Sequence, residues 1–256
     1  MNRTTAAWLA CALPGLAASV CAALEAPTTP TPTAPSAPTA PTATLRPYEA
    51  SYNFLWRGLN AGTSTFKLRQ EPGGEWLYTS RNEPRGLFKL VSAAAMTLTS
   101  HIKVDAETVR PLLFTAHEND ETALQAEVHF DWTTGRATGK VEDTPIDMPL
   151  RAGVQDDLSV QIAFIVALAN GRSPQGISMF DKNGIKDYTY TRVGEETLHT
   201  PVGEVATTIY LSQHTHSPRS TRFWCAPQYG YVPMRAEQRR EDKVEWTMNL
   251  RSIHRD

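Results

Sequence analysis

The chain of 256 residues has a formal net charge of −2, and 41% of its residues are hydrophobic. This balance argues against nucleic acid as the main partner, because no basic excess is present to bind phosphates. Without its low-complexity N-terminus, the length suits one all-β domain, whose core needs neither a disulfide nor a metal to be stable.

Residues 1–23 have the features of a secretory signal peptide. Arg3 supplies a positive charge, an apolar run follows, and small residues around Cys21 offer a cleavage site. We therefore expect an exported, periplasmic protein. Lipoprotein processing at Cys21 is an alternative, although Val20 stands where such sites favour a smaller residue.

Residues 24–47 are rich in proline, threonine and alanine, which predicts an extended, disordered linker. Residues 48–256 then form a single β-rich domain. Cleavage of the signal peptide would leave Cys225 as the only cysteine, so we expect no internal disulfide. A lone cysteine in this apolar setting is typical of a small buried side chain.

Short strands dominate the pattern after the linker. In residues 48–56, aromatic and small apolar residues alternate with polar ones, which predicts a half-buried strand. Asn183-Gly184 is a strong hairpin signal, and the other short links likewise favour antiparallel neighbours. We predict further strands at 63–68, 76–81, 96–104, 111–118, 124–132, 136–142, 146–150, 177–181, 185–193, 205–213, 221–225, 232–238 and 244–253.

One long helical run interrupts the strands at about 156–170. It is apolar on all sides, which indicates a helix covered by other elements, and it is too short to span a bilayer. Asp156 or Asp157 can cap its first amides, and Asn170-Gly171 ends it. We predict a mainly β fold, a strongly curved antiparallel sheet or incomplete β-barrel with this buried helix in its concave face.

Several spaced segments carry a resemblance to a known family. They are Trp56-x-Gly58-x-x-x-Gly62, Asp157-Leu158-Ser159, the stretch 193–203, Phe223-Trp224 and the stretch 231–235. In this order they resemble the DUF3108 family of bacterial exported proteins of unknown function. The resemblance implies export and a β-rich fold, and it brings no catalytic residues. The architecture is also similar to the half-barrel lipoprotein carriers of the cell envelope.

Polar clusters give no coherent catalytic set. His214 and His216 share a strand face, but a metal site needs further ligands, so we interpret them as surface residues. Asp156, Asp157 and Ser159 are better explained as helix-capping residues than as a hydrolase site. Glu195-Glu196 is interpreted as a solvated loop. We therefore expect no catalytic residue, no metal and no cofactor.

Aromatic residues suggest a ligand site instead. A curved sheet facing an apolar helix can leave a groove suited to lipid or acyl ligands, and we select Trp56, Phe88, Phe164 and Trp224 as its candidate lining. The apolar stretch 86–95 is interpreted either as a flap over that groove or as a bent edge strand.

Three functions follow, in decreasing order of preference. The first is non-catalytic binding of an apolar small molecule, a lipid or an envelope partner in the groove. The second is a tethered structural or protein-interaction module that uses a sheet edge. The third is a hydrolase with an unrecognised site. None of the three involves nucleic acid, and none needs a transmembrane span in the mature protein.

Overall fold

The computed structural model describes residues 45–86, 88–91, 94–105, 108–118, 124–215 and 217–255. The predicted signal peptide, residues 24–44 of the predicted linker and His216 lie outside the described residues. None of the helices in the described part of the chain is long and apolar enough to cross a membrane.

Fourteen strands, two α-helices and one 3-10 helix make up the described domain. The elements are β1 Tyr48–Trp56, β2 Leu59–Gln70, β3 Trp76–Pro84, α1 Phe88–Val91, β4 Met96–Asp105, β5 Thr108–Glu118, β6 Leu124–Asp131, β7 Arg136–Val141, β8 Thr144–Pro149, α2 Ser159–Ala169, β9 Gly176–Asp181, β10 Gly184–Thr200, β11 Gly203–His214, β12 Arg219–Ala226, η1 Pro227–Tyr229, β13 Val232–Arg240 and β14 Lys243–Arg255.

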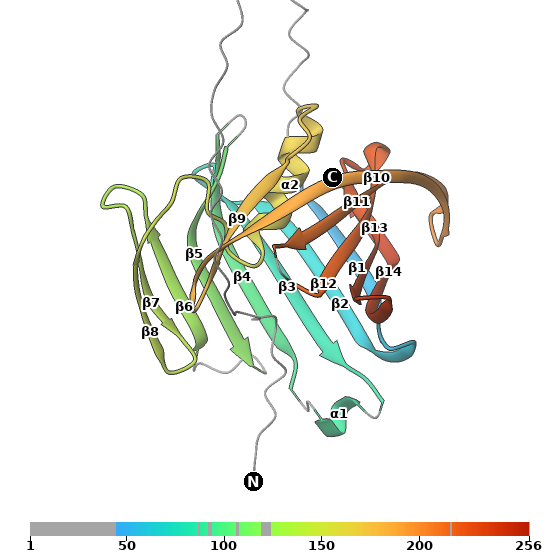
Figure 1. Cartoon of the computed structure of the whole chain (residues 1–256), viewed down its shortest axis with the longest axis horizontal. Helices are drawn as coiled ribbons and strands as arrows, with labels where there is room; N and C mark the ends of the chain where they lie inside the picture. The colour runs from blue at the N-terminus through green and yellow to red at the C-terminus, as the bar shows by residue number, and fades with distance from the viewer. Residues whose placement is uncertain are drawn as a thin grey trace, which may run out of the picture. The chain divides into compact units, whose positions relative to one another are not determined.

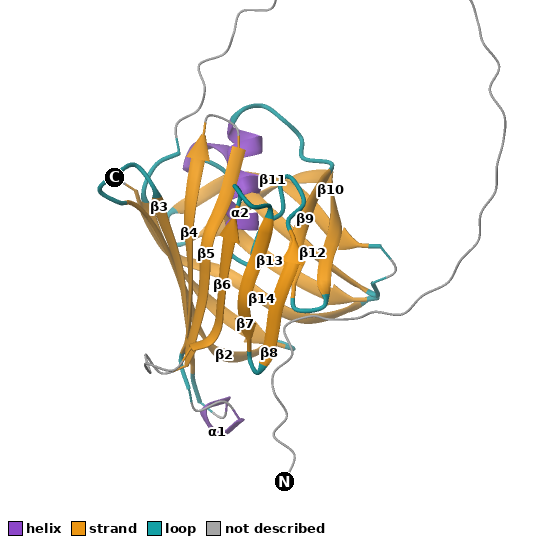
Figure 2. Ribbon diagram, turned by 90° about the vertical axis from the view of Figure 1, so that its left-hand side faces the viewer, coloured by secondary structure: helices purple, strands orange, loops and turns teal. Residues whose placement is uncertain are grey.

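All the described strands belong to one antiparallel sheet with the order β8-β7-β6-β5-β4-β3-β2-β1-β14-β13-β12-β11-β10-β9. Sequential neighbours pair except β8 and β9, and the first and last strands, β1 and β14, join the two halves. Because β8 and β9 are edges, the sheet is not closed into a barrel. It curves around α2, as Figures 1 and 2 show. The prediction of a curved antiparallel sheet with one buried helix is confirmed.

The backbone of the first hairpin explains why glycine occupies positions 58 and 62. Arg57 and Gly58 form the β1–β2 turn with φ of 48° and 82°, in the left-handed region that glycine tolerates best. Gly62 lies beside β3, where an added Cβ would be 2.1 Å from the carbonyl oxygen of Glu83. The spacing between the two glycines therefore reflects a tight turn followed by a close backbone approach.

The helix α2 is buried on both sides. Leu158, Ile162 and Ile165 belong to the main core cluster, whereas Phe164 and Leu168 belong to a second cluster formed with β10, β11 and β12. The predicted all-round burial of this helix is confirmed. The helix therefore contributes side chains to both core clusters of the domain.

Both ends of α2 follow their sequence signals. The Asp156 Oδ1 atom accepts hydrogen bonds from the backbone amides of Leu158 at 2.8 Å and Ser159 at 2.7 Å. Gly171 ends the helix in the left-handed conformation with φ of 69°. Asp156, rather than Asp157, therefore supplies the predicted cap.

The connection before α2 covers the opening between β8 and β9. Gln155 forms a parallel bridge with Met179 of β9. The Phe130 ring of β6 contacts the Phe180 ring of β9 edge-to-face, with 5.8 Å between centroids. These contacts link the two ends of the sheet without a strand pair.

Two local predictions are wrong. Glu195 and Glu196 do not lie in a loop, because β10 continues to Thr200 and pairs with β11 throughout that stretch. The 86–95 stretch is not a bent edge strand, because Phe88–Val91 is a short helix between the paired strands β3 and β4.

Candidate functional site

A row of apolar side chains crosses the inner face of the sheet next to α2. Phe54 of β1 lies opposite Met248 of β14, Met248 opposite Ala236, and Ala236 opposite Phe223 of β12. Residues opposite each other on neighbouring strands share a sheet face. Phe223 contacts Phe164 of α2, with 6.2 Å between ring centroids, so this face is the inner one. We call Phe54, Met248, Ala236 and Phe223 the inner row.

The inner row is only partly covered. Ala236 is buried, but Phe54, Met248 and Phe223 each keep intermediate exposure to solvent. Apolar side chains at inward-facing positions normally lie in the core. Here α2 covers one end of the row at Phe164, and the other end at Phe54 stays accessible.

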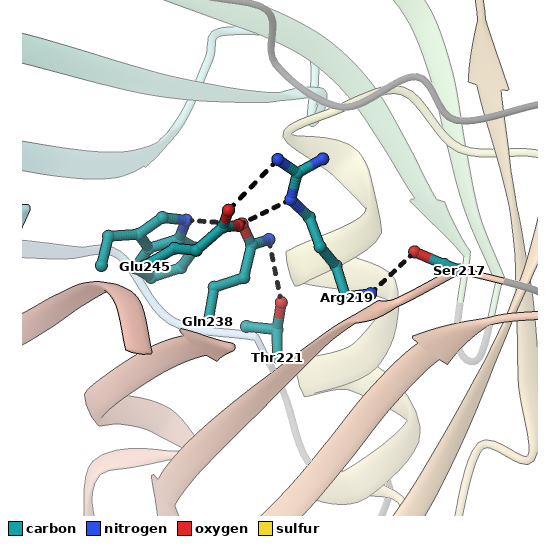
Figure 3. A network of polar contacts seen from close by, with 6 residues as sticks. Ser217, Arg219, Thr221, Gln238 and Glu245 are labelled. Carbon is teal, nitrogen blue, oxygen red and sulfur yellow. Dashed lines mark hydrogen bonds and ion pairs between the residues drawn. The ribbon is translucent and has the colours of Figure 1, made fainter. Parts of the chain in front are cut away.

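Next to the inner row lies a network of polar side chains, drawn in Figure 3. Trp246 packs beside Phe54 with 6.1 Å between rings, and its Nε1 donates to Gln238 Oε1 at 3.0 Å. Gln238 Nε2 donates in turn to Thr221 Oγ1 at 3.4 Å. The indole therefore has its polar atom satisfied and presents ring surface to the row.

The strongest contact of this network is an ion pair. Arg219 Nε donates to Glu245 Oε2 at 2.6 Å, and Arg219 Nη2 donates to Glu245 Oε1 at 3.2 Å. A two-point guanidinium–carboxylate contact fixes both side chains in orientation. Glu245 is nearly buried, so its charge depends on Arg219 for compensation.

The start of α2 holds a second polar cluster. Ser100 Oγ donates to Asp156 Oδ2 at 2.6 Å, and the Asp156 amide donates to Ser159 Oγ at 2.8 Å. Burial raises the pKa of Asp156 above its ordinary value, although the bonds from Ser100, Ser159 and Leu158 oppose the rise. All four groups are buried and mutually bonded, so this cluster stabilises the helix start.

Asp157 differs from Asp156 because its surface is exposed. Desolvation by the surrounding protein raises the pKa of Asp157 to about 7. The negative charges of Asp156 and Asp181 add to the rise, and the positive charge of Lys186 opposes it. Ser159 has no access to solvent. The Ser159 hydroxyl is thus bonded within the helix start, where it accepts from the Asp156 amide.

The structure does not gather the four predicted lining residues at one place. Phe164 is buried, with its ring 4.9 Å from Tyr190 and 5.2 Å from Tyr210. Trp56 ends β1 opposite Trp246 and is 36% exposed. Phe88 belongs to α1, which lies at the opposite end of the domain from α2 in both views (Figures 1 and 2).

Trp224 occupies the other face of the sheet from its neighbour Phe223, because side chains alternate along a strand. Its Nε1 donates to Glu196 Oε2 at 2.6 Å, and the Arg235 guanidinium lies over the ring at 4.7 Å. Glu196, predicted to be in a loop, is thus a partner of a buried tryptophan.

Phe54, Met248 and Phe223 were not among the predicted lining residues. Their alternation within each strand is visible, but the register between β1, β14 and β12 is not. Bulges at Ser51/Tyr52, Gln238/Arg239 and Trp224/Cys225 shift that register.

Among the described residues, no group of three histidine, cysteine, aspartate or glutamate side chains could hold a metal ion. His214 Nδ1 shares a hydrogen bond with the Asp187 carbonyl oxygen at 2.9 Å, and His216 lies outside the described residues. Cys225 is buried in the second cluster, and burial raises the pKa of its thiol, as expected of a small core residue.

An open antiparallel sheet wrapped around one helix, with an incompletely covered inner face, defines a β-barrel-like domain. A model of the family described as "Protein of unknown function (DUF3108)" matches residues 47–244. The chain therefore belongs to the DUF3108 family, which confirms the resemblance in the sequence. No curated protein matches the chain.

Among solved structures, the chain is similar in fold to a β-barrel-like protein of the domain of unknown function DUF1849 from Brucella abortus. The identity is 10%, the TM-score is 0.55, and the match covers 84% of this chain and 99% of that one. The Pseudomonas aeruginosa MucA/MucB complex matches at 9% identity over 84% of this chain and 53% of that one, with a TM-score of 0.38. That value is too low to support an inference.

Proposed function

We propose that the protein is an exported, periplasmic, non-catalytic domain that binds an apolar ligand, a lipid or acyl chain, on the inner row beside α2. The observation that supports this most is the partial exposure of Phe54, Met248 and Phe223 at positions that face the core. The signal-peptide features of residues 1–23 support export.

The physical basis is the transfer of hydrocarbon from water to the inner row. Each methylene buried contributes about 0.8 kcal/mol. Association costs roughly 4–15 kcal/mol in lost freedom, so a long acyl chain, rather than a short one, is needed for stable binding. The Trp246 ring adds apolar surface, and its satisfied Nε1 imposes no desolvation cost on such a ligand.

Native mass spectrometry of the exported protein, purified gently from a periplasm, tests the proposal. We expect a bound species that organic solvent extracts and that analysis identifies as a lipid or fatty acid. A clean apo mass, with no uptake of an added fluorescent fatty acid, would contradict it.

A pair of variants localises the binding. Phe54→Ser should weaken fatty-acid binding at least tenfold, because a polar hydroxyl replaces a partly exposed ring of the row. Val202→Ser is the matched control, since Val202 is 38% exposed in the β10–β11 turn, away from the row. Equal affinities of the two variants would place the ligand elsewhere.

The unpaired edges of the sheet support a second candidate function, that of a tethered interaction module. The edge strand β8 pairs with β7 on one side, and an extended partner could pair on the other. Pro145 and Pro149 lack backbone N–H donors, which limits such pairing. Deleting residues 27–46 separates the two functions, because ligand binding should survive the deletion, whereas assembly that depends on reach should weaken.

A further inference from the structure

A surface hollow of about 720 Å³ lies where the β1–β2 turn meets the β13–β14 hairpin. Its lining is mainly charged: Arg57, Glu237, Arg240, Glu241, Lys243 and Glu245, with Gly58, Val244 and Thr247. A volume of this size suits a small organic molecule, and the six charged lining residues favour one that carries a charged group. The hollow is therefore distinct in chemistry from the inner row.

Two of the carboxylates that line the hollow are already neutralised. Glu237 accepts from Arg235 at 2.6 Å and from Arg239 at 2.8 Å, and Glu245 is held by Arg219. Burial opposes ionisation of Glu237, yet the bonds from Arg239 and Arg235 leave its pKa below the ordinary value. Glu237 thus stays charged, and both carboxylates are paired with arginines.

The cations of the hollow have no such partners. Among the described residues, no ion pair joins Arg57, Arg240 or Lys243 to a carboxylate, and Glu241 likewise has none. Among the lining residues outside ion pairs, Arg57, Arg240 and Lys243 stand against Glu241 alone, which is an excess of two positive charges. An anion with two negative charges would balance them.

The backbone holds the walls of the hollow in place. Arg57 and Glu241 both adopt left-handed φ angles, 48° and 55°, which costs a residue with a side chain on the order of 1 kcal/mol. The Arg57 amide donates to the Glu245 carbonyl oxygen at 2.9 Å, and the Glu241 amide donates to the Pro218 carbonyl oxygen at 2.7 Å. The two turns that carry the charges are therefore fixed before any ligand arrives.

We propose that this hollow binds an organic phosphate monoester, with the phosphate held by Arg57, Arg240 and Lys243. A phosphate monoester carries close to two negative charges near neutral pH, and guanidinium groups bind its oxygens by paired hydrogen bonds. The phosphate fills only part of the hollow, which leaves room for a glycerol or sugar group. The source is a soluble ester or the headgroup of a lipid, and the inference does not require the inner row to bind anything.

Isothermal titration of the full chain with glycerol 3-phosphate, at pH 7.5 and low salt, tests the proposal. The double variant Arg57→Gln/Arg240→Gln should weaken binding on the order of tenfold or more. Arg57→Lys/Arg240→Lys keeps both charges but loses the paired guanidinium hydrogen bonds, so its affinity should lie between those of the parent and the glutamine variant. Lys140→Gln/Arg222→Gln is the matched control, because it removes two exposed positive charges outside the hollow.

Vesicles of phosphatidylcholine with and without phosphatidic acid distinguish the sources. Binding to phosphatidic acid vesicles alone, lost in the Arg57→Gln/Arg240→Gln variant, supports the hollow with a lipid as the source. Binding to glycerol 3-phosphate, lost in the same variant, supports it with a soluble ester. Either failure to bind both probes, or equal losses in this variant and the control, would overturn the proposal.

Discussion

Two parts of the inner face both carry aromatic side chains, but these side chains differ in their exposure to solvent. Beneath α2, Phe164 is enclosed by Tyr190 and Tyr210 and is almost inaccessible. A few strand positions away, Phe54 faces the same side of the sheet, yet it keeps part of its ring in contact with solvent. The two rings differ because α2 covers the sheet at one position and not at the other; the residue type is the same. An aromatic side chain in this domain contributes to stability or offers binding surface according to where the helix lies.

The largest effect should come from the covered part. Phe164→Ala removes a ring that three aromatic side chains contact, and it leaves a cavity that the helix cannot close. We expect a loss of about 3–5 kcal/mol in the free energy of unfolding, measured by urea denaturation. A loss below about 1 kcal/mol would mean that the cluster repacks and that the covered part is not the core.

The start of the helix should rank second. Asp156→Ala removes the acceptor of two backbone amides and leaves Ser100 without its partner, so we expect a loss of about 2 kcal/mol. Asp156→Asn keeps an oxygen for the amides and should lose less. Equal losses for the two variants would show that the cap bonds do not stabilise the helix.

A substitution in the open part should change the free energy of unfolding less than one in the covered part. Phe54→Ala removes a half-exposed ring, and we expect a loss of about 1 kcal/mol, well below that of Phe164→Ala. Fatty-acid binding, measured on the same sample, should fall at least tenfold. If Phe54→Ala destabilises as much as Phe164→Ala, the distinction between covered and open parts is wrong.

The smallest effect concerns Asp157 at the border of the covered part, because its side chain is exposed and solvent screens its interactions. Its pKa in the folded chain, about 7, lies above the ordinary carboxyl value of 3.8, so between these values the folded state binds more protons than the unfolded state. Its contribution to stability therefore falls as the pH rises through this window.

Asp157→Asn removes that titration, so the variant should gain stability relative to the parent between pH 4.5 and pH 7.5. Thermal unfolding of the two proteins at matched pH values measures the difference. A difference that stays constant with pH would show that Asp157 titrates normally.

Much of the fold is predictable because its signals are local. The alternation in Tyr48–Trp56 marks β1 with the correct bounds, and Asn183-Gly184 marks the β9–β10 hairpin. The apolar helix and its Asp156 cap also follow from neighbouring residues. Each of these features depends on side chains within a few positions of one another.

The inner row and the extent of β10 could not be predicted, because both depend on contacts between residues far apart in the sequence. Glu196 looks like a loop residue until Trp224, on another strand, is known to donate to it. Phe223, rather than Trp224, faces α2, and a bulge directly after Trp224 obscures which of the two points inward. The candidate lining therefore included the buried outer tryptophan and omitted Phe54.

The pairing of the first and last strands has a consequence for how the chain acquires its fold. Tyr48 lies opposite Arg255, whereas the other strand pairs of the described sheet join sequential neighbours. The strands before α2 and those after it can each pair through local hairpins. The β1–β14 pairing, by contrast, carries the entropic cost of closing a long loop. A circular permutant with Tyr48 linked to Arg255 and new ends between Gly171 and Gly176 would have only local strand pairs. It should fold faster than the parent chain into the same sheet.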